Sequence, residues 1–99
     1  MKIKITNGET CPMDDDSQLV ELVASVDIAD ADAFDLICAK VVGDWAWDTA
    51  PEEMDGRWLA SFNLTMPIND DGADWIRIKD AQKSGKPALR KALQSAARG

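Results

Sequence analysis

Ten residues of this chain, 57–66, alternate strictly between two faces of an extended segment. Five of them share one face and carry its large or apolar side chains: Trp58, Ala60, Phe62, Leu64 and Met66. A period of two is typical of a β-strand with one face in a core. We therefore predict a strand over 57–66 that Pro67 ends, and a fold that contains a sheet.

Shorter segments predict the rest of that sheet. Three more stretches alternate and are expected as strands: 2–6, 44–48 and 74–79. The 44–48 stretch places Trp45 and Trp47 on one face, and the 74–79 stretch turns Ile76 and Ile78 inward. Turns or loops are expected where the chain is rich in turn-forming residues: Asn7-Gly8, Pro51–Gly56 and Asn69–Gly72.

Three segments have apolar residues at helical spacing. Residues 16–26 carry such a stripe after Asp14, Asp15 and Asp16, and residues 31–42 carry another. Asp30 or Asp32 would begin the second helix, and Gly43 would end it. Pro87 suits the first turn of a third helix over 87–97. The predicted fold is a single acidic α+β domain over 1–99, a small antiparallel sheet with helices packed on one face, in the order β-α-α-β-β-β-α.

Charge is divided unevenly along the chain. Residues 1–74 hold 17 acids and 4 bases, for −13, whereas residues 75–99 hold 1 acid and 7 bases, for +6. Two runs, Glu9–Asp35 and Asp44–Asp55, contain acids and no base. Acids without neighbouring bases repel one another and project a negative field that attracts basic partners.

These runs supply the candidate partner-binding residues. We select their carboxylates, and Trp75 as an exposed aromatic anchor: Asp14, Asp15, Asp16, Glu21, Asp27, Asp30, Asp32, Asp35, Asp44, Asp48, Glu52, Glu53, Asp55 and Trp75. Asp14, Asp15 and Asp16 have two other interpretations, helix capping and a metal cluster. Capping explains one or two of the three.

The absence of histidine argues against catalysis. It removes the commonest general acid/base and the commonest metal-binding nitrogen at once. We predict no enzyme activity, no catalytic residues, no metal and no cofactor. Cys11 and Cys38 are the two cysteines, and without an export signal we expect free thiols in the cytoplasm.

The basic end of the chain has two explanations. Lys83 and Lys86 lie near a helix start, where the helix dipole disfavours cations, so helix formation alone does not account for them. The helix either docks on the acidic body and is neutralised there, or it forms a second, basic contact surface.

Small size, lack of histidine and the base-free runs Glu9–Asp35 and Asp44–Asp55 give the chain a compositional resemblance to a known class. The chain resembles the small acidic phage-encoded inhibitors of host defence, which include anti-CRISPR proteins and DNA mimics. The resemblance extends over most of the chain. It implies that the protein blocks a basic, nucleic-acid-handling protein or ribonucleoprotein complex without turnover, in the host cell cytoplasm.

Other functions stay open at this point. An acidic immunity or antitoxin-type protein, or an assembly accessory protein, would satisfy the same charge argument. A small enzyme would need two carboxylates in unequal environments within a pocket. A nucleic-acid binder using residues 75–99 would bind weakly, because the −13 of the remaining chain repels the same polymer. We expect no membrane partner.

Overall fold

A computed structural model describes residues 2–13, 17–28, 30–67 and 72–98, without the side chains of 48–51 and 72–75. The described elements run β1 (Ile3–Pro12), β2 (Ser17–Val26), α1 (Ala31–Ala39), β3 (Ala46–Met54), β4 (Arg57–Pro67) and α2 (Gly72–Arg98). Within these residues the four strands form one antiparallel sheet in the order β1-β2-β4-β3. The α+β class and the antiparallel sheet are confirmed, but the predicted element order is wrong.

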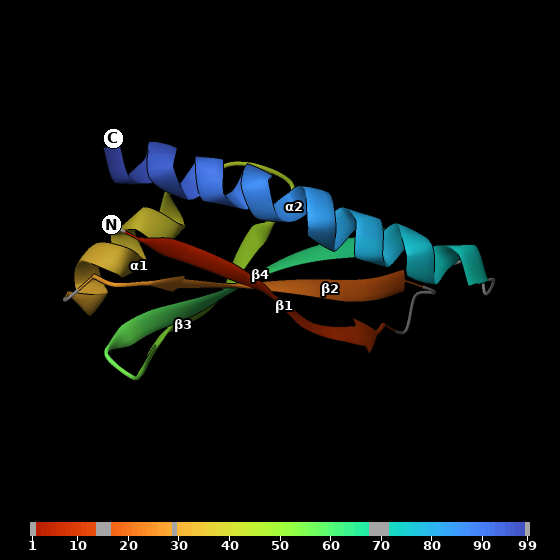
Figure 1. Cartoon of the computed structure of the whole chain (residues 1–99), viewed down its shortest axis with the longest axis horizontal. Coiled ribbons are helices and arrows are strands. Elements are labelled where there is room, and N and C mark those ends of the chain that lie inside the picture. The colour runs from red at the N-terminus through yellow and green to blue at the C-terminus, as the bar shows by residue number, and fades with distance from the viewer. Residues whose placement is uncertain (1, 14–16, 29, 68–71, 99) are drawn as a thin grey trace.

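One face of the sheet carries the core. Val20, Leu22 and Ala24 of β2 lie opposite Leu64, Phe62 and Ala60 of β4, and all but the half-buried Leu64 are buried. Phe34 and Cys38 of α1 and Leu89 and Leu93 of α2 belong to the same buried cluster. Both helices therefore pack on that face, as expected, and Figure 1 shows α2 lying across the sheet above β1 and β2. The opposite face has no helix in the described chain.

The predicted helix over 16–26 is wrong, because this segment is the central strand β2. Gln18, Val20, Leu22, Ala24 and Val26 are buried in alternation, which is a period of two. Leu19 and Val23 on the other face made the same segment fit a helical spacing as well. Three β-branched valines favour the strand.

The predicted turn at Asn7-Gly8 is a β-bulge inside β1. Asn7 pairs with Leu22 and Thr10 pairs with Val20, so two residues of β1, Gly8 and Glu9, oppose Glu21 alone. A side chain at Gly8 would collide with the carboxyl group of Glu21, which lies against it. Glycine therefore allows the close approach rather than a chain reversal.

The helix predicted over 31–42 is confirmed in position but ends earlier. Asp30 is the N-cap, and its Oδ1 accepts the backbone N–H of Asp32 at 3.0 Å. The helix stops at Ala39, with Lys40 as C-cap. Gly43, with φ of 151°, lies in the following connection rather than directly at the helix end.

The strand predicted over 44–48 and the loop predicted over Pro51–Gly56 are both corrected by β3. This strand begins at Ala46, after Trp45, and continues to Met54. Asp55 and Gly56 then form a two-residue hairpin between the paired Met54 and Arg57. Their φ values of 53° and 77° are both positive, as a type I′ turn requires, and Asp-Gly is a favoured sequence for it. β4 confirms the strand predicted over 57–66.

The strand predicted over 74–79 and the helix predicted over 87–97 are parts of one helix, α2. Its inner face repeats at helical spacing and is buried: Ile78, Gln82, Gly85, Leu89, Leu93 and Ala96. Because Gln82 and Gly85 are not large apolar residues, the apolar side chains alone did not indicate this helical period. Pro87 lies inside the helix rather than at its first turn. The predicted turn at Asn69–Gly72 lies outside the described residues, except that Gly72 belongs to α2.

Candidate functional site

Six exposed carboxylates gather at one end of the sheet. β2 ends at Val26, which pairs with both Ile3 and Trp58, so the chain leaves β2 beside the β3–β4 hairpin. A short connection leads from there to the start of α1, and Figure 1 places α1 and the hairpin at the same end of the molecule. We call the set of exposed residues at this position the acidic end: Asp27, Asp30, Asp32, Glu52, Glu53 and Asp55.

Two carboxylates of the acidic end have structural partners. Asp27 accepts the backbone N–H of Lys2 at 2.7 Å, and this hydrogen bond lowers the pKa of the Asp27 carboxyl below its usual value. Asp30 caps α1. Within the described part of the chain, Asp32, Glu52, Glu53 and Asp55 make no side-chain hydrogen bond or ion pair. These four therefore present their charge to solvent.

The arginine at the same end is directed into the sheet. Arg57 donates from Nε to Ser25 Oγ at 2.7 Å and from an Nη atom to the backbone oxygens of Ser25 and Lys2, at 3.0 and 3.1 Å. It thus joins the ends of β4, β2 and β1. These three hydrogen bonds hold the Arg57 side chain against the strand ends, and it forms no salt bridge with a described carboxylate.

Three other predicted site residues that the structure describes are not members of this exposed set. Glu21 is half-buried on the helix-free face, and its Oε1 accepts the N–H of Glu9 at 3.3 Å. Asp35 is half-buried on α1, and Asp44 is exposed beside α2. The structure does not describe residues Asp14, Asp15 and Asp16, or the side chains of Asp48 and Trp75. The backbone of Trp75 belongs to α2 and not to the strand predicted there.

The cationic helix is docked through its apolar face and keeps its charges outside. Most of its bases are exposed, and Lys86 is half-buried. No salt bridge with a described carboxylate involves the following side chains: Lys79, Lys83, Lys86, Arg90, Lys91 and Arg98. The helix therefore docks, as the first alternative predicted, but described carboxylates do not neutralise these bases, and a basic outer surface remains.

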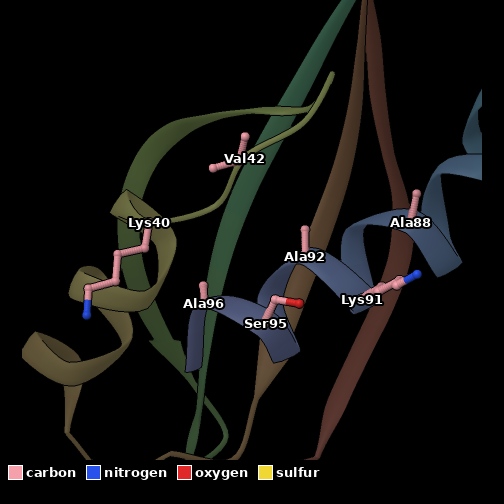
Figure 2. Close-up of a pocket in the computed structure, with 7 residues that line it drawn as sticks. All are labelled: Lys40, Val42, Ala88, Lys91, Ala92, Ser95 and Ala96. Carbon is pink, nitrogen blue, oxygen red and sulfur yellow. The ribbon is translucent and has the colours of Figure 1, made fainter. Parts of the chain in front are cut away.

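A groove that was not predicted runs between α2 and the connection 40–45. Its wider part has a volume of about 500 Å³ and is lined by Lys40, Val42, Ala88, Lys91, Ala92, Ser95 and Ala96 (Figure 2). A narrower part of about 270 Å³ shares Val42, Ala88 and Ala92 and reaches Trp45 and Gly85. The small residues of α2 at helical spacing were the available sequence signal, but only the fold supplies the second wall.

The two thiols have opposite environments. Cys11 is exposed in β1, whereas Cys38 is buried in the core, and both are free. Burial, with the negative charge of Asp35, raises the pKa of the Cys38 thiol to about 12. Cys38 is therefore an unreactive core residue.

Comparison with known proteins finds no matching family model, no matching curated protein and no matching solved structure. Neither helix in the described residues combines the length and apolar content needed to cross a bilayer.

Proposed function

We propose that this protein is a non-enzymatic inhibitor that binds a basic, nucleic-acid-handling protein or ribonucleoprotein complex through its acidic end. The observation that carries the proposal is the convergence of six exposed carboxylates from two chain segments, 27–32 and 52–55, with Arg57 directed inward. Exposed like charges at one end cost some stability and gain long-range attraction for a cationic cleft.

The position of the charges narrows the mode of binding. The base-free run Glu9–Asp35 is divided among β1, β2 and α1, so its carboxylates do not follow the two helices that were predicted over 16–26 and 31–42. A compact acidic end suits insertion into a basic cleft that normally holds nucleic-acid phosphates. We propose that the chain acts in this way, like the anti-CRISPR proteins and related phage inhibitors that it resembles in composition.

Affinity capture from the native host, followed by identification of the retained protein, tests the partner class. A retained nucleic-acid-handling complex supports the proposal, and a retained toxin favours the immunity-protein alternative. Binding to the captured partner should weaken at least about tenfold between low and moderate salt, because it depends on screened charges. Binding that does not change with salt would contradict an electrostatic mode.

Charge-reversal variants test which surface of the protein binds the partner. Glu52→Lys, Glu53→Lys and Asp55→Lys, made together, should weaken binding by about tenfold or more, since they reverse three unpaired charges of the acidic end. The matched triple variant Asp14→Lys, Asp15→Lys and Asp16→Lys changes net charge by the same amount. A larger loss in this second variant would move the binding surface away from the acidic end.

A further inference from the structure

The groove along α2 has an apolar floor and cationic flanks. Ala88, Ala92 and Ala96 keep the helix surface low, so that an incoming side chain can approach the backbone closely. Val42 forms the opposite wall and is 86% exposed, so it lacks a partner that would cover it. In Figure 2 the Lys40 and Lys91 side chains extend in opposite directions from this hollow.

This arrangement suits one unbranched apolar side chain with carboxylates on both sides. The wider part of the groove is lined by two lysines and, among its lining residues, by no acid. Small alanines leave room for a flexible side chain, and methionine fits irregular hollows because it is unbranched and polarizable. Carboxylates beside such a residue would meet the ammonium groups at either side.

The chain itself carries a segment of this chemistry. Met54 is 61% exposed at the tip of the β3–β4 hairpin. Glu52, Glu53 and Asp55 surround it in sequence and are exposed as well. The type I′ turn fixes this tip in one conformation, so little order has to be gained on binding.

The tip cannot enter the groove of its own molecule. Pairing of Met54 with Arg57 holds the tip at the end of the sheet, whereas the groove lies on the helix layer beside α2. We propose that the groove receives the Met54 tip of a second copy of this chain. The contact is heterologous, since tip and groove are different surfaces, and it can repeat from copy to copy. It goes beyond the proposed inhibitor function and does not depend on it.

Sedimentation equilibrium of the full chain, up to roughly millimolar protein, measures this association, which is weak because the interface is small. The average mass should rise above that of one chain as concentration increases. Val42→Glu, which places an acid in the groove, and Met54→Ser, which removes the anchor, should each weaken association by about tenfold or more. Both residues are exposed, so neither change disturbs the core.

Two control variants distinguish this specific contact from non-specific association through exposed apolar residues. Leu36 and Ile76 are each 62% exposed and do not line the groove, so Leu36→Ser and Ile76→Ser should leave association unchanged. A mass of one chain over the whole concentration range would overturn the proposal. So would association that survives Val42→Glu or Met54→Ser, or that the control variants abolish.

Mixing the two impaired variants tests whether the tip of one chain binds the groove of another. The Val42→Glu chain keeps its tip, and the Met54→Ser chain keeps its groove. The average mass of an equal mixture should therefore rise toward that of two chains and never exceed it, at concentrations where each variant alone associates about tenfold less than the wild type. A mixture that stays single would overturn the proposal. Partner binding through the acidic end should survive Val42→Glu, so failure of self-association is distinguishable from failure of the proposed function.

Discussion

Gly85 of α2 lies directly against the indole ring of Trp45. A Cβ atom on Gly85 would stand 2.7 Å from three atoms of that ring, which is closer than such contacts occur. Trp45 is 7% exposed, so the ring is held in the core and cannot swing into solvent. Glycine in a helix normally weakens it by about 1 kcal/mol relative to alanine, and here it makes the packing of helix on loop possible.

We therefore expect Gly85→Ala to lower the free energy of unfolding by about 1–3 kcal/mol despite alanine's better helix propensity. In a Trp45→Ala background the collision is absent, and the same change should raise stability. Denaturant unfolding of the four proteins in this double-mutant cycle measures the reversal of sign. Ser84→Ala, on the exposed side of α2, is the control and should change stability little. Destabilisation of equal size in both backgrounds would contradict the steric explanation.

Gln82 links α2 to the bulged region of the sheet. Its Nε2 donates to the backbone oxygen of Glu21 at 3.2 Å, and the side chain is 6% exposed. Gln82→Met keeps the side-chain volume but removes the donor, so we expect a loss of about 1–2 kcal/mol in unfolding free energy. Gln94→Met, at an exposed position of the same helix, should stay within about 0.5 kcal/mol of the wild type. Equal effects at the two positions would refute the role of this hydrogen bond.

Arg57 should not be replaceable by lysine. Its planar group donates from two nitrogens to Ser25 and Lys2, a geometry that a single ammonium group cannot reproduce. We expect Arg57→Lys to cost about 1–3 kcal/mol of stability. It should also speed amide hydrogen exchange at the start of β1. Arg90→Lys, at an exposed position, should be close to neutral. An unchanged rate of amide hydrogen exchange near Lys2 in the Arg57→Lys variant would argue against this role of the Arg57 hydrogen bonds.

Cys38 should make stability fall at high pH. Its pKa is raised from 9.0 to about 12 in the fold, so between these values the folded chain keeps a proton that the unfolded chain has lost. The free energy of unfolding should therefore decrease as pH rises above 9, by up to about 1.4 kcal/mol per pH unit. Cys38→Ala removes this contribution, and its denaturant midpoint should fall less steeply over the same range. Equal slopes in the two proteins would show that Cys38 is not the cause.

Local chemistry alone determined several parts of this protein. The strict alternation of 57–66 predicted β4 and its buried face, and an aspartate before an apolar helical stripe predicted the start of α1. The charge division predicted an acidic surface, and four of its members, Asp32, Glu52, Glu53 and Asp55, are exposed without a partner in the described residues. These features depend on side-chain period and charge, which are properties of the sequence itself.

Only the tertiary structure decided the rest. Residues 17–26 fit both a helix and a strand, and pairing on both sides with β1 and β4 selected the strand. Pro87 predicted the first turn of a separate helix, but packing against Trp45 and the core holds one continuous helix that also includes residues 74–79. The acidic end and the groove each join residues distant in sequence. Their formation depends on sheet order and helix docking, because long-range contacts outweigh local propensities of about 1 kcal/mol.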